Sequence, residues 1–254
     1  IVIGARDLAK ADRIAEEIGN ARGLGVSLDR RDLGLSANEA FSAVVPFLKD
    51  PSMNALRFAQ ETGAAFVSLS SGVFEIGQET AHYIHRPQSV PVLMASNWLA
   101  GAATFPTLQA LREYRRVDSI DITVVLDEQD MGGPAAAADF ERLTSSAPRP
   151  LIVKGGAYVW AGPEDAARKV RVIDGAEVEA QAYAPFDVLS LSALTGAPSI
   201  RLDLVYGMSS SRRRGEPFST EIIIEMSGEK TDGTSGHTRH ELMHPEGQAP
   251  VTAL

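Results

Sequence analysis

The sequence predicts an α/β protein. A doubly wound parallel sheet, with its first βα unit absent, should be followed by a second, α+β domain whose sheet is largely antiparallel. Strand and helix patterns alternate through residues 1–114, as they do in a parallel α/β sheet. Residues 115–250 carry many short strand patterns and few helical ones, and residues 251–254 fit the start of a further helix.

The chain opens on a buried strand pattern, Ile1–Gly4, which runs directly into an amphipathic helix pattern. Apolar residues recur on one face of this helix and charged residues on the other, which is typical of a helix packed on a sheet. The apolar residues are Leu8, Ala11, Ile14, Ala15 and Ile18.

The rest of the first domain is predicted from turn residues and apolar runs. Pro51 suits a first helical position, Gly63 suits a helix cap, and Pro106 should kink or split the helix that contains it. The expected strands are 25–29, 41–47, 65–69 and 91–95, and the expected helices are 51–62 and 99–114.

The second domain is predicted mainly from alternation. Ser119–Leu126 alternates apolar and polar residues, which favours a strand with one wet face. Residues 227–233 have turn composition, so 220–226 and 238–243 should pair as a hairpin. Further strands are expected at 151–153, 158–160, 171–173 and 200–206, with a helix at 135–143.

Composition excludes several classes of function. The chain has 254 residues, a net charge of −9 and no cysteine, which argues against a nucleic-acid partner and rules out disulfides and thiolate sites. No apolar run reaches the roughly 18 residues of a membrane helix, and no signal peptide is visible. We therefore expect a cytoplasmic protein that acts on a small molecule.

The predicted strand order contains a gap. In the doubly wound order 3-2-1-4-5-6, strand 1 lies at the centre of the sheet. If Ile1–Gly4 is strand 2 and 41–47 is strand 4, both would face this gap with unpaired backbone groups, which cost about 1–3 kcal/mol each when buried. We expect a fragment that lacks about 30 residues. The alternative is a complete chain with another α/β order.

Several segments carry a family resemblance. Ile1–Ala11, Val44–Phe47 and Gly63–Ser70 resemble segments of the saccharopine dehydrogenase-like oxidoreductases. That family is NAD(P)-dependent, has a Rossmann-type domain and acts on amino acids joined through a secondary amine, or on related imines. The resemblance implies a nicotinamide cofactor, an α+β substrate domain and a homodimer.

The sequence also departs from the family. The Gly-rich turn is not in the chain, and the strand that often ends in an acidic residue ends here in Ser70-Ser71-Gly72. The resemblance therefore supports the fold and the cofactor better than it supports a substrate.

Arg6 favours NADP over NAD. An acidic residue at the end of strand 2 would bind the ribose 2′-OH of NAD, whereas an arginine can pair with the 2′-phosphate of NADP. Gly4 and Ala5 would lie beside the cofactor, and Lys10 would add a second positive charge. The alternative is that Arg6 is a solvated turn residue and Asp7 an ordinary N-cap.

Ligands of open α/β sheets bind at the carboxyl ends of the strands. The residues expected to frame the cofactor there are Pro46, Phe47, Ser70, Ser71 and Asn97. Lys49 could hold a substrate carboxylate, and Trp98 could line the substrate site or serve as core packing. The alternative is that these are turn and capping residues.

Three residues of the second domain are further candidates. Asp130 lies in an acidic loop and His240 has a suitable ordinary pKa, so both could transfer a proton. Arg213, in a basic cluster, could bind an anionic substrate group, although a plain exposed loop is the alternative. We predict no metal site, because His237 and His240 would face opposite sides of a strand.

The first hypothesis is an NADP-dependent oxidoreductase. It would transfer a hydride between nicotinamide and an imine, amine or carbonyl carbon of an amino-acid-like substrate. A second hypothesis is an NADP-responsive binding or regulatory protein of the same fold without turnover. A third, an α/β hydrolase or transferase without nicotinamide, has no supporting motif in the sequence.

Overall fold

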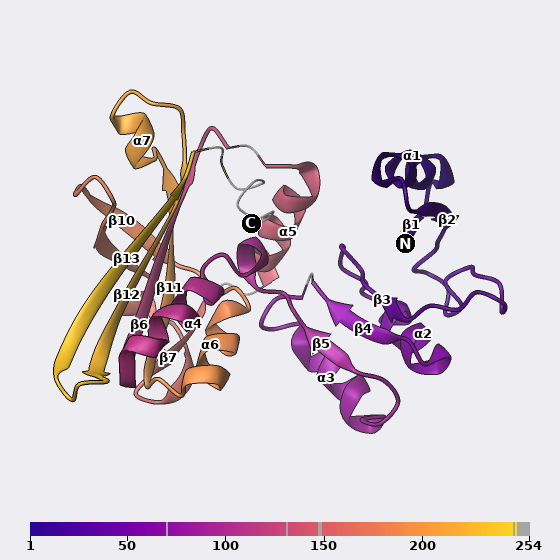
Figure 1. Cartoon of the computed structure of the whole chain (residues 1–254), viewed down its shortest axis with the longest axis horizontal. Coiled ribbons are helices and arrows are strands. Elements are labelled where there is room, and N and C mark those ends of the chain that lie inside the picture. The colour runs from indigo at the N-terminus through magenta and orange to yellow at the C-terminus, as the bar shows by residue number, and fades with distance from the viewer. Residues whose placement is uncertain (70, 131, 147–148, 246, 248–254) are drawn as a thin grey trace. The chain divides into compact units, whose positions relative to one another are not determined.

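The computed structural model describes residues 1–69, 71–130, 132–146, 149–245 and 247 (Figure 1). Two predictions, Ser70 and the helix start at 251–254, lie outside the described residues. The chain divides into two compact units, each of which is described by itself. Unit 1 comprises Ile1–Ser71 and Glu75–Ala95, and unit 2 comprises Gly72–Phe74 and Ser96–Leu254.

Unit 1 begins with the predicted strand and helix. Strands β1 (Val2–Ala5) and β2 (Arg22–Gly25) pair in parallel and are joined by helix α1 (Leu8–Ile18). A Cβ at Gly23 would lie 2.7 Å from the backbone nitrogen of Asp12, so the close approach of α1 to β2 requires glycine there.

The second part of unit 1 is also parallel. Its elements are β3 (Ala43–Val44), α2 (Asn54–Thr62), β4 (Ala65–Ser68), α3 (Ile76–His85) and β5 (Val92–Met94). The strands pair in the order β3-β4-β5, and α2 packs on them through a small apolar core. The buried members of that core are Ala55, Leu56, Ala59, Ala64 and Phe66.

The gap predicted from the sequence is visible in unit 1. Among the described residues, β1 pairs only with β2, and β3 pairs only with β4. Each pair therefore leaves one strand edge without a partner, at the position that strand 1 holds in the doubly wound order. An apolar groove separates β1 from β3.

Unit 2 contains the larger sheet and most of the helices. Its first elements are η1 (Trp98–Gly101), α4 (Thr104–Ala110), η2 (Leu111–Glu113), β6 (Tyr114–Asp127), α5 (Pro134–Ser146), β7 (Leu151–Lys154) and β8 (Ala157–Trp160). The later ones are η3 (Pro163–Asp165), β9 (Ala167–Arg171), β10 (Glu177–Ala182), α6 (Asp187–Thr195), β11 (Ser199–Gly207), α7 (Ser210–Arg213), β12 (Thr220–Lys230) and β13 (Ser235–His244).

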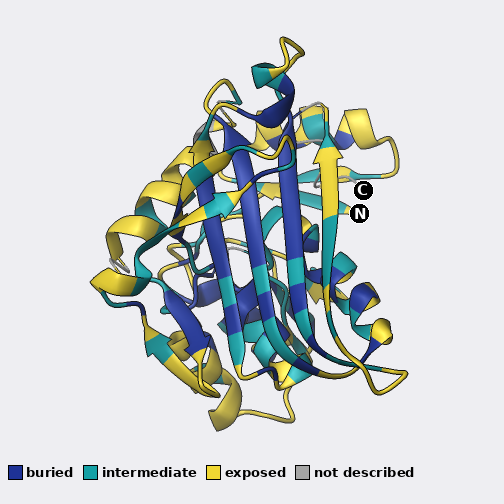
Figure 2. Ribbon diagram, turned by 90° about the vertical axis from the view of Figure 1, so that its left-hand side faces the viewer, coloured by how far each residue is buried: buried dark blue, intermediate teal, exposed yellow. Residues whose placement is uncertain are grey.

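The sheet of unit 2 is largely antiparallel, as predicted. In the described residues its strand order is β13-β12-β6-β11-β10-β9, with β7 pairing to β11 and β8 to β7. Only the β6–β11 pairing is parallel among these. Its central strands are buried over much of their length, shown in dark blue in Figure 2.

The core of unit 2 lies between this sheet and helices α4 and α6. Apolar residues at every second position of β6, β11 and β12 face these helices, since strand side chains alternate between the two faces. Ile122, Ile200 and Ile224 are each at most 1% exposed. Burying one such side chain contributes about 1.5–3 kcal/mol.

Residues 96–114, which the sequence analysis placed with the first domain, belong to unit 2. The predicted helix 99–114 is split, as Pro106 suggested, and Pro106 lies in the first turn of α4. Its buried face, which includes Ala103 and Ala110, packs against the unit 2 sheet.

Several predicted boundaries were wrong. The strand expected at 25–29 is Arg22–Gly25, because pairing with β1 overrides the low strand propensity of its glycines. The strand expected at 41–47 contains only Ala43–Val44, since Pro46 lacks an N–H and one edge has no partner. The strand expected at 171–173 is Ala167–Arg171, paired with β10.

The helix expected to begin at Pro51 begins at Asn54. Asp50 accepts hydrogen bonds from Ser52 N–H at 3.0 Å and Ala55 N–H at 2.7 Å, which holds the preceding residues in a turn. Met53 takes a left-handed φ of 57° before the helix starts. The cap at Gly63 is confirmed by its φ of 80° and its N–H bond to Ala59.

Four α-helices and strands were missed by the sequence analysis: α3, β10, α6 and the short helix α7. Strand β10 does show alternation in Val178, Ala180 and Ala182, so its signal was present. The hairpin turn lies at 231–234 rather than 227–233, because β12 continues to Lys230. Among the described residues, no helix is both long and apolar enough to span a membrane.

Candidate functional site

The groove between β1 and β3 is the main candidate site of unit 1. It encloses about 540 Å³, a volume typical of small-molecule sites. Its floor is apolar, with Val2, Leu24 and Phe58 among the lining residues. Five residues predicted to bind the cofactor line it together: Gly4, Ala5, Arg6, Pro46 and Phe47.

Arg6 lies on the β1 side of this groove and directly follows the last residue of the strand. Its side chain is exposed and makes no hydrogen bond or ion pair with the described residues. Asp7 caps α1 by accepting a hydrogen bond from Ala9 N–H at 3.0 Å. Arg6 is therefore a free cation at the carboxyl end of a parallel strand, where ligands of this class of sheet bind.

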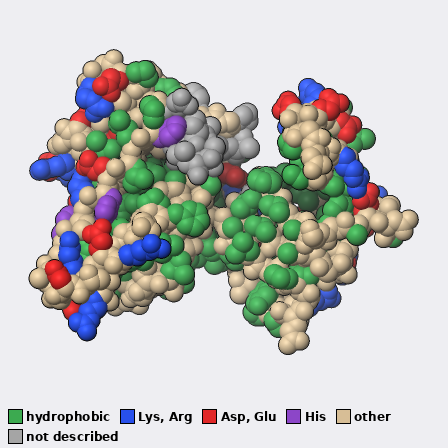
Figure 3. Space-filling model, viewed as in Figure 1, with side chains coloured by type: hydrophobic (Ala, Val, Ile, Leu, Met, Phe, Trp, Pro, Cys, Tyr) green, Lys and Arg blue, Asp and Glu red, His purple; other side chains and the backbone are tan. Residues whose placement is uncertain are grey.

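The β3 side of the groove is apolar. Phe47 is 79% exposed and Leu48 is 57% exposed, which is unusual for large apolar side chains. Figure 3 shows hydrophobic side chains gathered on the face of unit 1 that is in view. Lys10, the other predicted cation, is exposed on α1 and is not one of the described residues that line the groove.

A buried polar cluster lies at the carboxyl end of β4. Glu79 of α3 is 4% exposed and accepts hydrogen bonds from Ser68, at 2.9 Å, and from Ser71. Lys49 Nζ donates to Ser71 Oγ at 3.4 Å and lies 3.6 Å from the Glu75 carboxylate. These contacts bring together Lys49 and Ser71, which the sequence predicted separately.

Glu79 is the functional candidate that sequence reasoning missed. It lies in α3, which was not predicted, and a single glutamate in a polar stretch gives no signal by itself. Its Oε2 atom is buried and has no hydrogen-bond partner in the described structure. Such an atom is costly unless the site uses it, because an unpaired buried polar group costs about 1–3 kcal/mol.

Asn97 and Trp98 belong to a second buried cluster, in unit 2. The Asp187 carboxylate is fully buried and accepts hydrogen bonds from Trp98 N–H at 2.7 Å and Thr104 Oγ1 at 2.5 Å. Asn97 Nδ2 donates to Thr104 Oγ1 and to Ser190 Oγ, both at 3.1 Å. The cluster fixes the backbone at the start of η1.

The acidic residue of this second cluster has a raised pKa. Burial raises the pKa of Asp187, and the hydrogen bonds from Thr104 and Trp98 only partly offset that effect. Burial also raises the pKa of Tyr183 to about 12. The Tyr183 ring meets Trp98 edge to face at 5.1 Å between centroids, so Trp98 serves at least in part as core packing.

The remaining candidates lie on separate elements of unit 2. Arg213, in α7, is held by Asp174, with Nε 2.5 Å from Oδ2. His240, in β13, sits opposite Ile224 and has a buried Nε2 with no hydrogen-bond partner in the described structure. Asp130 follows β6 and is half-buried. Their catalytic and substrate-binding roles stay predictions.

The acidic loop after β6 is largely structural. Asp127 is fully buried, accepts hydrogen bonds from the N–H groups of Gln129 and Ser209, and pairs with Arg212 at 3.1 Å. Burial opposes its ionisation, but these donors outweigh burial and lower the pKa of Asp127. The carboxylate therefore ties β6 to α7.

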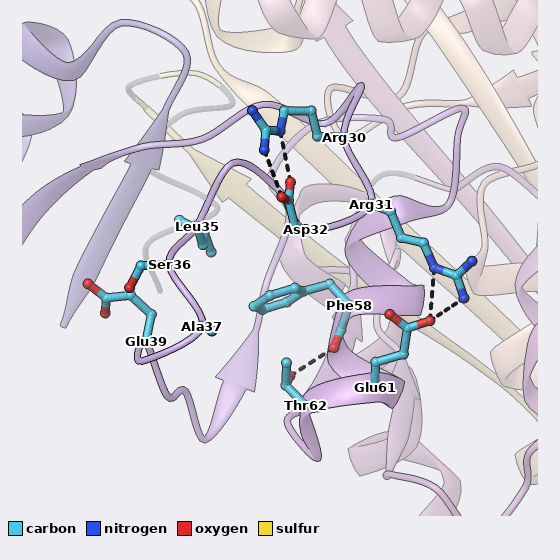
Figure 4. A pocket seen from close by; sticks show the side chains of 10 residues that line it. All are labelled: Arg30, Arg31, Asp32, Leu35, Ser36, Ala37, Glu39, Phe58, Glu61 and Thr62. Atoms are coloured by element: carbon cyan, nitrogen blue, oxygen red, sulfur yellow. Dashed lines mark hydrogen bonds and ion pairs between the residues drawn. The ribbon is translucent and has the colours of Figure 1, made fainter.

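A wider hollow of about 770 Å³ lies under the loop that follows β2 (Figure 4). Its charged side chains pair with one another: Arg30 with Asp32 at 2.7 Å, and Arg31 with Glu61. The bond from Arg31 lowers the pKa of Glu61. Because these charges are already satisfied, the hollow offers a ligand little that is free to bind it.

No family model matches the sequence. No curated protein matches it either. The fold is similar to that of apo saccharopine dehydrogenase (L-Glu forming) from Saccharomyces cerevisiae, with a TM-score of 0.64 at 10% identity over 99% of this chain and 82% of that chain.

Two other solved structures are less similar. The scyllo-inositol dehydrogenase from Lactobacillus casei, with bound NAD(H) and scyllo-inositol, gives a TM-score of 0.48 at 11% identity over 94% of this chain and 67% of that chain. The aspartate dehydrogenase from Thermotoga maritima gives a TM-score of 0.44 at 11% identity over 99% of this chain and 91% of that chain. These scores are too low to argue from, so the fold assignment rests on the yeast enzyme.

The comparison confirms the predicted fold. The chain has a Rossmann-type α/β unit followed by an α+β unit, as in saccharopine dehydrogenase. At this level of identity the similarity establishes the fold, and function has to be argued from the site.

Proposed function

We propose that this chain belongs to an NADP-dependent oxidoreductase that transfers a hydride between nicotinamide and an imine, amine or carbonyl carbon of an amino-acid-like substrate. The observation that carries the proposal is the unpaired Arg6 at the carboxyl end of β1, in a fold similar to that of saccharopine dehydrogenase. The cofactor would supply the hydride chemistry, and the protein would supply position, charge and protons.

The residues of the groove fit the adenosine end of NADP. An arginine without a protein partner can form a two-pronged contact with a 2′-phosphate, which is the group that separates NADP from NAD. Gly4 leaves little room for a larger residue, since a Cβ there would lie 2.9 Å from Val26 Cγ2. We place the cofactor at the carboxyl end of β1, because ligands of open α/β sheets bind at the carboxyl ends of the strands.

The cluster around Glu79 would form the polar end of the substrate site. Glu79 holds Ser71 by a hydrogen bond, and Ser71 lies beside Lys49 Nζ. In this proposal Lys49 binds a substrate carboxylate, since the ammonium is held by Ser71 Oγ at 3.4 Å and by a longer, 3.6 Å ion pair with Glu75, and a charge-assisted hydrogen bond to a ligand would be stronger than that long pair. Glu79 is a positioning residue that acts through Ser71.

The cofactor proposal is tested with half of the cofactor, so that no substrate is needed. Calorimetry would compare 2′,5′-ADP with 5′-AMP, which differ only in the 2′-phosphate. We expect Arg6→Ala to weaken 2′,5′-ADP binding about 10- to 100-fold, because it removes a charge-assisted contact. Binding of 5′-AMP should not change.

Arg13→Ala is the matched control, because Arg13 is an exposed arginine on the same helix. If Arg6→Ala and Arg13→Ala lose equal affinity for 2′,5′-ADP, the effect comes from the net charge of the protein and not from a contact with Arg6. If wild-type protein does not prefer 2′,5′-ADP over 5′-AMP, the assignment of Arg6 to NADP is wrong.

The reaction is tested by NADPH oxidation with a panel of keto acids, each with and without an amine. We expect Lys49→Ala to raise KM for the carboxylate substrate at least tenfold, with a smaller change in kcat, because a binding contact is lost. Cofactor binding without oxidation across a broad panel would instead favour a binding or regulatory protein of this fold.

A further inference from the structure

Unit 1 has a second pocket whose charges the proposed reaction does not use. It lies along α2 and α3, encloses about 420 Å³ and is lined by residues of both helices and the preceding loops. Five basic side chains line it: Arg31, Arg57, His82, His85 and Arg86. Among the described residues that line the pocket, the only acidic one is Glu61. This is a concentration of positive charge in a chain whose net charge is −9.

Most of this positive charge is not neutralised. Glu61 is bound by Arg31, and Figure 4 shows the two side chains in contact. Arg57 and Arg86 make no side-chain hydrogen bond or ion pair with any described residue. The pocket therefore keeps two unpaired guanidinium groups beside two histidines.

The excess charge affects the titration of His82. The pKa of His82 is lowered, first by burial and then by the positive charges of Arg57, Arg86 and His85. The single carboxylate of Glu61 serves Arg31, Arg57 and Arg86 together, so the positive charges are only partly compensated and repel one another. A bound anion would remove that repulsion.

Helix structure explains only part of the arrangement. His82 and His85 lie in the last turn of α3, where positive charge is stabilised by the helix dipole. Arg57 lies in the first turn of α2, where the dipole disfavours a cation. The half-buried position of Arg57 therefore has no local explanation.

We propose that this pocket binds the phosphate group of a small phosphorylated molecule, with Arg57 and Arg86 as the principal contacts. Guanidinium groups match the geometry of phosphate oxygens, and two of them can hold one tetrahedral dianion. The volume exceeds that of a phosphate group alone, which leaves room for an organic part. The inference does not depend on the proposed oxidoreductase activity.

The test is calorimetry with three probes: sulfate, inorganic phosphate and ribose 5-phosphate. We expect a Kd of about 1 mM or tighter for ribose 5-phosphate and weaker binding of both inorganic ions. Arg57→Gln and Arg86→Gln should each weaken binding about tenfold or more. Arg13→Gln, on the exposed face of α1, should have no effect.

Folding of the variants can be separated from binding. Arg86 is exposed, so Arg86→Gln should fold normally. Arg57 is half-buried, so Arg57→Lys, which keeps the charge, serves as a second variant and should bind more tightly than Arg57→Gln. Circular dichroism would confirm the fold of each.

Sulfate also tests the role of His82, because it remains a dianion between pH 8 and about pH 5.5. The groups that face His82 are Arg57, Arg86 and His85, with Glu61 and Arg31 nearby in the pocket. A bound anion favours the protonated imidazole, so sulfate affinity should rise as the pH falls. His82→Gln should reduce that rise.

Two results would overturn the proposal. One is the absence of saturable binding of all three probes up to about 10 mM at pH 6. The other is binding that Arg57→Gln and Arg86→Gln leave unchanged. Equal affinity for ribose 5-phosphate and the inorganic ions would overturn the assignment to a phosphorylated molecule.

Discussion

The two units of this chain are built very differently. In unit 2, β6 has 14 residues and β12 has 11, and their inward side chains form one continuous core with α4 and α6. In unit 1 the strands have between 2 and 4 residues, and the cluster under α2 has five buried members. Unit 2 therefore has long strands around a large continuous core, whereas unit 1 has short strands and a small core.

Two groups of arginines, one in each unit, differ in whether their charge is paired. The arginines of unit 2 around α7 are each held by a carboxylate: Arg212 by Asp127, Arg213 by Asp174 and Arg214 by Glu216. In unit 1, Arg6, Arg57 and Arg86 have no partner among the described residues. A cation that the fold does not neutralise is available to a ligand, so we look for binding in unit 1.

The sharpest test of this contrast is one core substitution in each unit. Ile224 is 0% exposed in unit 2 and Leu56 is 0% exposed in unit 1. Each change to alanine should cost about 2–5 kcal/mol, because it removes buried methyl groups and leaves a cavity. Ile224→Ala should lower the stability of unit 2, and Leu56→Ala should lower that of unit 1.

The two effects can be measured separately by denaturant unfolding. Both tryptophans, Trp98 and Trp160, lie in unit 2, so fluorescence reports on that unit. Hydrogen exchange in β4 and α2 reports on unit 1. If both probes report a single transition and both substitutions shift it equally, the two units unfold together. The units would then not differ in stability.

A loss of stability of similar size is expected at Asp187. Asp187→Ala leaves Trp98 N–H and the Thr104 hydroxyl without their acceptor, at a cost of about 1–3 kcal/mol for each group. The change should lower the thermal midpoint followed by tryptophan fluorescence. If Asp187→Ala lowers the thermal midpoint no more than the substitution of an exposed aspartate does, the cluster does not stabilise η1.

Asp187→Asn tests the pH dependence of the same cluster. Because burial raises the pKa of Asp187, the folded state keeps this proton to a higher pH than the unfolded state does. The contribution of Asp187 to stability therefore falls as the pH rises through this range. Asparagine cannot ionise, so the thermal midpoint of Asp187→Asn relative to wild type should rise as the pH increases above about 4, the ordinary pKa of an aspartate. A constant or falling difference would contradict the raised pKa.

The smallest effect is expected at the N-cap of α1 in unit 1. Asp7→Ala removes the acceptor for Ala9 N–H and should cost about 1 kcal/mol. Faster hydrogen exchange in the first turn of α1 would show this, with no change in unit 2. Asp7→Ser should restore most of the loss, since serine also caps helices.

Local signals predicted much of the fold. The apolar face of α1, the glycine cap after α2 and the alternation in β6 each depend on residues close in sequence. The register of β2 did not follow from such signals. Its glycines form a strand only because β1 pairs with them, and pairing between distant segments leaves no local pattern.

The candidate site divides in the same way. Arg6 could be named from the sequence, because it directly follows a recognisable strand. Glu79 could not, because its importance comes from Ser68 and Ser71, which lie 11 and 8 residues away along the chain. The pocket at Arg57 and Arg86 also unites residues from two helices, one of which had no clear sequence signal.

By itself, the sequence determined the class of fold and the residues at the ends of its strands, because apolar periodicity and turn residues act over a few positions. Only the tertiary structure decided which polar groups are paired. It showed that the arginines of α7 are paired with carboxylates, while Arg6, Arg57 and Arg86 of unit 1 form no ion pair with the described residues. The physical reason is that a charge is satisfied by whatever the fold brings within a few ångströms, and sequence distance does not report that.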